Sequence, residues 1–291
     1  MKNLRYLQED AIDQGTLRIR VNGRSEGNPV EDARISIGYT GDPSQPIEEV
    51  MTDASGNTDT LTLNAPPVEY SMEPGEIQPY AEYTITVSAP GYRSINISGI
   101  DVMSGQLSIQ KVELEAEDAA GNEKANIAIP DHTLWGNFPP KIPEDEIKTV
   151  AETGEIVLSR VVIPEYVVVH AGGPNDNTAP NYYVRYRDYI KNVASSEIYA
   201  TWPDATIRAN VLAIMSFTLN RVYTEWYRGK GKNFTITNST AYDHAFTYGR
   251  NIFQSISNVV DEMFENYLSR PNVRQPILTQ YCDGQKVSCP N

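Results

Sequence analysis

The stretch "YIKNVASSEIYATWPDATIRANVLAIMSFTLN", residues 189–220, predicts two consecutive helices separated by a Trp-Pro break. The first helix is predicted over residues 186–199. Ile190, Val193 and Glu197 lie on one face of it, because positions i, i+3 and i+7 of a helix point to the same side. An acidic side chain therefore shares the apolar face of this helix, close to its end.

The position of Glu197 supports two interpretations. Burial among apolar residues disfavours the charged carboxylate and raises its pKa, so the acid stays protonated near neutral pH and can donate a proton to a leaving oxygen. This chemistry cleaves glycosidic bonds. Alternatively, Glu197 at the helix end faces water or pairs with Arg208. Helix geometry alone leaves both interpretations open.

Charge is distributed unevenly along the 291 residues, which predicts two units with different surfaces. Residues 1–160 carry 27 acidic and 12 basic side chains, whereas residues 161–291 carry 11 and 12. The acidic first half argues against a nucleic-acid partner, because phosphate binding needs clustered Lys and Arg.

No segment approaches the ~20 apolar residues that span a bilayer, so no membrane span is predicted. No secretory signal is recognised either.

The first half has the pattern of a small β-sandwich over residues 16–114, after an N-terminal extension of residues 1–15. "TLRIRV" and "ARISIGY" alternate apolar and polar residues as half-buried strands do, and "NGRSEGNPVED" between them is typical of a turn. "NPVEDARISI", with the later "TDASGN" and "YTITVSAPGY", resembles the carboxypeptidase-regulatory-like domains, which are prealbumin-like sandwiches. That resemblance implies a role in folding or docking.

Residues 115–160 are acidic, contain several prolines and lack sustained periodicity, which predicts a linker. The β-branched run "VVIPEYVVVH" then predicts a buried strand at the start of a helix-rich second domain, residues 161–291. Apolar spacing predicts a helix that starts at Pro203 and extends through Trp226. A third helix is predicted over residues 251–268.

The helical stretch resembles the signature of the SpoIID/LytB family. In "DYIKNVASSEIYATWPDATIRANVLA" a Tyr-containing helix ends in small residues and an acid, and an aromatic-Pro break and a second helix follow. Glu197 occupies the motif position of the family's catalytic acid. The segments "STAYDHAFTYG" and "TQYCDG" resemble later segments of the family. The resemblance covers roughly residues 161–291. It implies substrate-binding roles for Tyr189, Arg208, Asn210, Tyr242 and Tyr281.

A narrower resemblance, to clostridial spore cortex-lytic enzymes, rests on "IPEYVVVHAG", "YIKNVASSEIYATWP", "RVYTEWYRGKG" and "QYCDG". It implies an α+β protein in which a prealbumin-like β-sandwich pro-region precedes a helix-rich SpoIID-like α+β catalytic domain. The implied activity is that of a peptidoglycan lytic transglycosylase, made as a zymogen, that acts on the spore cortex during germination. The implied partners are peptidoglycan glycan strands and an activating germination protease, a Csp-type subtilase. The implied location is the cortex or coat region of the spore.

The chain departs from the family pattern at two points. Met215 stands where the family usually has an Arg, and the chain stops at "KVSCPN", before the motifs with which the family continues. The LytB branch includes amidase enhancers, so a non-catalytic peptidoglycan-binding or amidase-enhancer protein is the alternative function. A lone acid fits a transglycosylase, because the C6 hydroxyl of muramic acid supplies the nucleophile and no second carboxylate is needed.

The sequence predicts no metal site and no cofactor. His132, His170 and His244 are scattered, and two cysteines do not make a zinc site. For Cys282 and Cys289, a disulfide and two reduced thiols both remain open.

Aromatic residues of "NYYVRYRDY" and "TEWYRGKGK" are candidates for stacking on sugar rings, with a core position as the alternative for Trp226.

Proteolytic maturation is predicted between Thr149 and Val162, because exposed linkers are preferred cleavage sites and a later cut would destroy the buried strand. The β-rich half is predicted to be dispensable for chemistry, and to assist folding or to mask a basic cleft.

Overall fold

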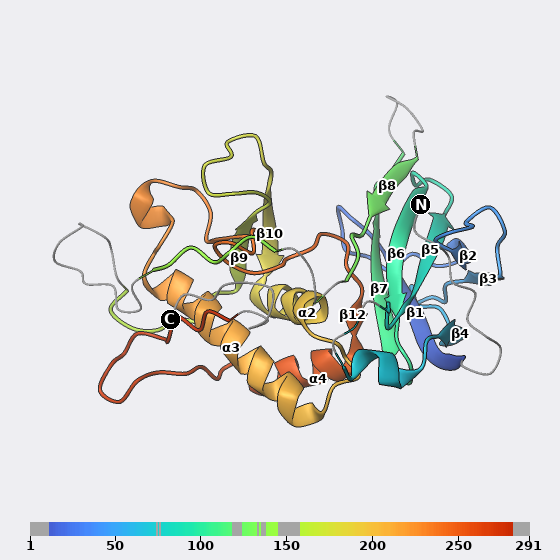
Figure 1. Ribbon diagram of the computed structural model, residues 1–291. Helices are drawn as coiled ribbons and strands as arrows, with labels where there is room; N and C mark the ends of the chain where they lie inside the picture. Colours follow the sequence, from blue (N-terminus) through green and yellow to red (C-terminus); the bar gives the residue numbers. More distant parts are fainter. Residues whose placement is uncertain are drawn as a thin grey trace. The chain divides into compact units, whose positions relative to one another are not determined.

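The computed structural model shows a mixed α+β protein (Figure 1) and describes residues 12–73, 75, 77–117, 124–132, 134, 138–144 and 158–281. The chain divides into two compact units. Unit 1 contains residues 1–132 and two segments from later in the chain, residues 199–202 and 248–255. Unit 2 contains residues 133–198, 203–247 and 256–291.

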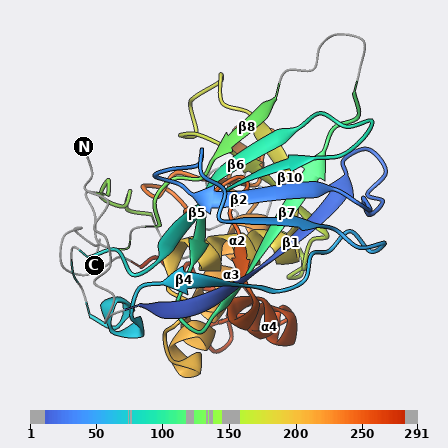
Figure 2. The same cartoon turned by 90° about the vertical axis from the view of Figure 1, so that its right-hand side faces the viewer.

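Unit 1 is built mainly from β-strands, which can be followed in Figure 1 and Figure 2. They are β1 (Asp13–Gly23), β2 (Arg34–Tyr39), β3 (Glu48–Met51), β4 (Leu61–Ala65), β5 (Ala81–Ser88), β6 (Ile95–Val102), β7 (Leu107–Leu114), β8 (Ala125–Ala128) and β12 (Ile252–Phe253), with a 3-10 helix η2 (Val68–Ser71). One sheet has the order β12-β7-β1-β4 and the other β3-β2-β5-β6-β8. β1 with β7 and β6 with β8 are parallel pairs, and the other neighbours are antiparallel.

The two sheets of unit 1 enclose one hydrophobic cluster. Alternate residues of β1, namely Leu17, Ile19 and Val21, are fully buried in it, and β2 contributes Ile35 and Ile37 in the same way. This alternation follows from the strand geometry, which points successive side chains to opposite faces. The patterns "TLRIRV" and "ARISIGY" therefore correspond to real strands with one face in the core.

Two strands of unit 1, β8 and β12, were not predicted from the sequence. β8 lies within residues 115–160, which the sequence predicts as a linker, and it extends the second sheet beside β6. β12 comes from the second half of the chain and pairs with Ser108 and Ile109 of β7. Strands of four and two residues carry too little periodicity to be recognised from sequence.

Buried polar contacts hold residues 248–255 within unit 1. Arg250 Nη1 donates to Asp101 Oδ2 at 2.5 Å. The Asn251 side chain accepts from the backbone N–H of Asp101 and donates to its carbonyl, both at 3.0 Å. His132 Nδ1 lies 3.3 Å from the same Asp101 Oδ2. Asp101 thus joins the end of β6 to two segments that are remote in sequence.

The described part of unit 2 combines three α-helices with a small sheet. The helices are α2 (Tyr186–Glu197), α3 (Asp204–Tyr223) and α4 (Gln254–Met263), whose first two residues belong to unit 1, and a 3-10 helix η3 (Arg228–Lys230) follows α3. The sheet has the order β10-β9-β11, with β9 (Tyr166–His170), β10 (Asn181–Arg185) and β11 (Ile236–Thr237). The central strand β9 buries Val167, Val168 and Val169, as the run "VVIPEYVVVH" predicts.

The helix boundaries differ from prediction at four ends. α2 ends at Glu197 because Ile198 is already extended, and α3 ends at Tyr223, before Trp226. α4 starts after the two residues of β12, not at residue 251 as predicted, and ends well before residue 268. Within the residues described here, no helix is both long enough and apolar enough to span a membrane.

Candidate active site around Glu197

Glu197 is the last residue of α2. Ile190 and Val193 on the same helical face are fully buried, whereas Glu197 keeps partial exposure. The expected spacing is therefore real: the acid shares the apolar face and lies where that face ends.

Two hydrogen bonds and one cation surround the Glu197 carboxylate. Oε1 accepts from the backbone N–H of Ala245 at 2.6 Å, and Oε2 accepts from the hydroxyl of Tyr281. The Lys141 ammonium interacts electrostatically with the carboxylate and donates to the carbonyl of Asp243 at 2.8 Å. Segments from three distant parts of the sequence thus meet at one acid.

These surroundings act on the pKa of Glu197 in opposite directions. Burial raises it above the ordinary value of 4.5, while Lys141, the Tyr281 hydrogen bond and the Ala245 N–H lower it, and the net change is upward. Burial and the charge of Glu197 also raise the pKa of Tyr281, so its hydroxyl keeps the proton that it donates. Burial favours the acid form, and the donors favour the carboxylate.

Neutral aromatic groups line the buried side of this cluster. Tyr189, on α2, has its hydroxyl 3.2 Å from Nδ1 of His244, and His244 stacks on Tyr281 with ring centroids 6.2 Å apart. Burial lowers the pKa of His244 well below 6.5, and the charges of Lys141 and Arg221 lower it further. The imidazole is therefore uncharged at neutral pH.

A buried ionic network supports the loop that carries Ala245. Arg221 Nε donates to Asp243 Oδ1 at 2.7 Å, and its two Nη atoms donate to the Glu144 carboxylate at 2.6 and 2.8 Å. The side chains of Arg221 and Asp243 are 0% exposed, and that of Glu144 is 6% exposed. Burial lowers the pKa of Arg221, and the two carboxylates outweigh it, so the pKa is raised overall.

The second carboxylate oxygen of Asp243 accepts three hydrogen bonds. Oδ2 accepts from the hydroxyl of Tyr227 at 2.7 Å and from the backbone N–H and hydroxyl of Thr237 at 2.8 and 2.7 Å. Asp243 therefore joins α3, β11 and the loop that precedes Ala245. This restraint fixes the backbone donor that faces Glu197.

Three of the predicted site residues belong to the cluster: Glu197, Tyr281 and Tyr189. Tyr242 lies nearby through its carbonyl, which accepts from Arg221 Nη2 at 3.1 Å.

Two other predicted site residues have partners elsewhere. Arg208 forms ion pairs with Asp204 at 2.6 Å and Glu262 at 2.7 Å, so the alternative in which it pairs with Glu197 is wrong. Asn210 donates to the carbonyl of Thr206, one turn earlier on α3, at 2.9 Å.

The residues that support Glu197 are not predicted by the sequence patterns. Lys141 and Glu144 fall in the predicted linker, where no periodic pattern marks them. Asp243 and His244 lie within the quoted "STAYDHAFTYG" but had no assigned role. Arg221 was an available signal, because it lies in the mainly apolar second half of α3 and buried charges need partners.

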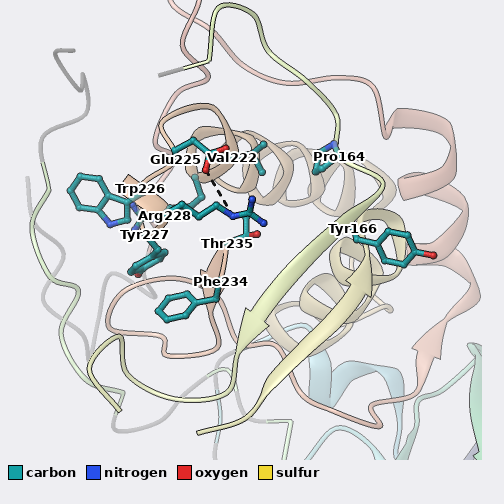
Figure 3. Close-up of a pocket in the computed structure, with 10 residues that line it drawn as sticks. Pro164, Tyr166, Val222, Glu225, Trp226, Tyr227, Arg228, Phe234 and Thr235 are labelled. Atoms are coloured by element: carbon teal, nitrogen blue, oxygen red, sulfur yellow. Dashed lines mark ion pairs between the residues drawn. The ribbon is translucent and has the colours of Figure 1, made fainter. Parts of the chain in front are cut away.

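A pocket of about 250 Å³ lies beyond the end of α3 (Figure 3). Figure 3 shows the rings of Trp226, Tyr227 and Phe234 on the side opposite Tyr166. Glu225 and Arg228, 3.9 Å apart, contribute polar groups to its lining, as do Arg221 and Thr235, and Val222 and Pro164 complete it.

The aromatic candidates for sugar stacking have different environments. Trp226 is partly buried, and Lys230 Nζ lies 3.0 Å from its ring centroid. Tyr183 on β10 is 77% exposed, while Tyr186 and Tyr227 are buried. Tyr183 and Trp226 therefore offer ring surface to a ligand.

Within the part of the chain that the structure describes, no group of three or more His, Cys, Asp or Glu side chains is arranged to hold a metal ion. The predictions for Cys282 and Cys289 lie outside the described residues, as do residues 149–157 of the predicted maturation interval.

No family model and no curated protein matches the chain. Among solved structures, it is similar to catechol 1,2-dioxygenase of Acinetobacter radioresistens, with 18% identity, coverage of 41% of this chain and 58% of that chain, and a TM-score of 0.25. The chain is also similar to the minor pilin GBS52 of Streptococcus agalactiae, with 13% identity, coverage of 38% of this chain and 48% of that chain, and a TM-score of 0.28. A third similar structure is 5-hydroxyisourate hydrolase of Klebsiella pneumoniae, with 18% identity, coverage of 35% of this chain and 92% of that chain, and a TM-score of 0.24.

Proposed function

We propose that this chain is a peptidoglycan lytic transglycosylase proenzyme that cleaves glycan strands of the spore cortex during germination. Its motifs resemble those of SleC, the clostridial spore cortex-lytic enzyme of the SpoIID/LytB family. The same proposal assigns the sandwich as a prealbumin-like pro-region and the helix-rich part as the catalytic domain. It also assigns Glu197 as the general acid and then the general base.

The environment of Glu197 is the observation that carries the proposal. A general acid must hold its proton near neutral pH, and burial raises the pKa of Glu197 in that direction. It must also survive as a carboxylate between the two steps. The Ala245 N–H and the Tyr281 hydroxyl are donors aimed at that carboxylate.

The reaction needs two proton transfers through one residue. Protonated Glu197 gives its proton to the glycosidic oxygen, the bond from C1 to that oxygen breaks, and the leaving sugar departs with a hydroxyl group. The C6 hydroxyl of muramic acid then attacks C1, its proton passes to the Glu197 carboxylate, and the 1,6-anhydro ring closes. The acid is restored and no water is consumed.

Aromatic surface in the pocket beyond the end of α3 supports glycan binding. Trp226 lines the pocket in Figure 3 and is partly exposed, and flat rings pack well against the apolar faces of sugars. Arg228 in the same pocket suits an acidic group of a peptide stem.

A muropeptide digest tests the proposal. Cortex peptidoglycan is incubated with the protein, and the products are separated by liquid chromatography and identified by mass spectrometry. New 1,6-anhydromuramic ends support the transglycosylase. Reducing muramic ends identify a hydrolase, and tight binding without cleavage identifies the binding or amidase-enhancer alternative.

A further inference from the structure

We propose that Lys141 is a positioning residue for Glu197 and that Glu144 anchors it, so that residues 141–144 complete the candidate active site. This inference rests on the proposed function of Glu197. It adds to the site a segment that the sequence predicts as part of a linker, outside residues 161–291.

Glu144 fixes the segment to unit 2. Two Nη atoms of Arg221 donate to its carboxylate, and both side chains are shielded from solvent. A bidentate Arg–carboxylate pair is directional, and removing one partner leaves an uncompensated buried charge. The backbone N–H of Ile142 adds a 2.8 Å hydrogen bond to the carbonyl of Ala241. The segment is therefore held at both the side-chain and the backbone level.

Lys141 acts on the acid in two ways. Its ammonium donates to the carbonyl of Asp243, two residues before the Ala245 N–H that holds Glu197. It also lies 5.9 Å from the ring centroid of Tyr281, the other donor to the carboxylate. The cation thus restrains the loop that orients Glu197 and stabilises the carboxylate formed after the first proton transfer.

Several other charged or titratable groups surround this site: Tyr189 from α2, Arg221 from α3, Asp243 and His244 from the loop, and Tyr281 from the C-terminal segment. Among the groups that act on the pKa of Glu197, Lys141 opposes burial most strongly. Burial lowers the pKa of Lys141, and Glu197 and Asp243 oppose this change.

The test uses the full chain with three variants, Lys141→Met, Lys141→Arg and Glu197→Gln. The carboxyl carbons of Glu are labelled with carbon-13, and the Glu197 signal is assigned by its loss in Glu197→Gln. Lys141→Met removes the charge at similar length and is expected to raise the pKa of Glu197. It is also expected to move the basic limb of the pH–rate profile upward and to lower kcat about tenfold with little change in KM. Lys141→Arg keeps the charge and retains the wild-type pKa.

The outcomes separate this inference from the proposed function. Active enzyme whose Lys141→Met variant keeps the wild-type pKa of Glu197 and the wild-type pH profile overturns the role of Lys141. A rise in kcat in that variant overturns it as well, since it would make the segment an inhibitor. If the wild-type protein cleaves no glycan, the titration alone decides, and an upward shift supports the coupling while the transglycosylase proposal fails.

Hydrogen exchange tests the anchor. Glu144→Gln is expected to speed the exchange of the Ile142 amide, because the segment loses its charged partner. Glu165→Gln, at an exposed position of the same unit, is the matched control and leaves that amide unchanged. Unchanged protection of Ile142 in Glu144→Gln overturns the anchoring role.

Discussion

The backbone N–H of Ala245 donates to Glu197 Oε1 at 2.6 Å, which joins the end of α2 to a loop 48 residues later in the chain. This donor belongs to the main chain, so its position depends on the residues that hold the loop. Asp243, with its buried partner Arg221, is one such residue. The chemistry of the acid is thus coupled to an ionic network that does not touch it.

Glu197→Gln is expected to lower the release of anhydromuropeptides by roughly 10²–10⁴-fold, because an amide cannot carry the proton. The amide oxygen still accepts from Ala245, so the fold is retained, which circular dichroism checks. Glu265→Gln, at an exposed position after α4, is the matched control and keeps wild-type activity. Most of the activity surviving in Glu197→Gln would show that another group is the acid.

Tyr281→Phe removes the hydroxyl that donates to Glu197 and favours its ionised form. The pKa of Glu197 is therefore expected to rise further, since a hydrogen bond to the charged form of an acid favours that form. The protonated acid then persists to higher pH, and the basic limb of the pH–rate profile moves upward. Tyr267→Phe, at an exposed position, serves as control. A limb that stays in place in Tyr281→Phe contradicts this contact.

Arg221→Met is expected to destabilise unit 2 by about 3–5 kcal/mol, because it leaves Glu144 and Asp243 buried without their cation. Urea unfolding measures the change. Arg208→Met removes an Arg whose ion pairs are screened by solvent, and it should cost much less. Adding Glu144→Gln and Asp243→Asn to Arg221→Met should restore part of the lost stability. Equal costs for the Arg221 and Arg208 variants would mean that the network is not coupled to folding.

Because His132 and His244 are buried, the free energy of unfolding is expected to fall at acidic pH. Burial lowers the pKa of each below the ordinary 6.5. Between the folded value and 6.5 the unfolded chain binds more protons, so their contribution is complete above pH 6.5 and declines as the pH falls. Each residue adds a slope of up to about 1.4 kcal/mol per pH unit. His132→Phe should remove one such slope from urea unfolding measured as a function of pH, and an unchanged slope would contradict its neutral burial.

Cleavage by the germination protease is expected to leave a new N-terminus between Thr149 and Val162. A cut within β9 would break the central strand of the unit 2 sheet, so the stable fragment should start before Tyr166. The two fragments are expected to co-elute from a sizing column, because residues 248–255 are part of unit 1 through β12 and Arg250. N-terminal sequencing and the elution profile check both points. Separation without denaturant, or a terminus inside the sandwich, would refute this expectation.

Local patterns were sufficient for the elements that have a long repeat. Alternation in "TLRIRV" specified which side of β1 enters the core, and helical spacing specified that Glu197 shares a face with Ile190 and Val193. Pro203 correctly marked the start of α3. These features depend on residues a few positions apart, so a single sequence contains them.

The partners of the acid depend on contacts over much longer separations. The Glu144–Arg221 pair spans 77 residues, and Tyr281 lies 84 residues from Glu197. β12 has only two residues, and its place in unit 1 depends on pairing with β7 and on Arg250 meeting Asp101. A single charged or polar residue has no period that reveals its partner. Its role is set by whether folding removes water from it and which opposite group then lies within reach.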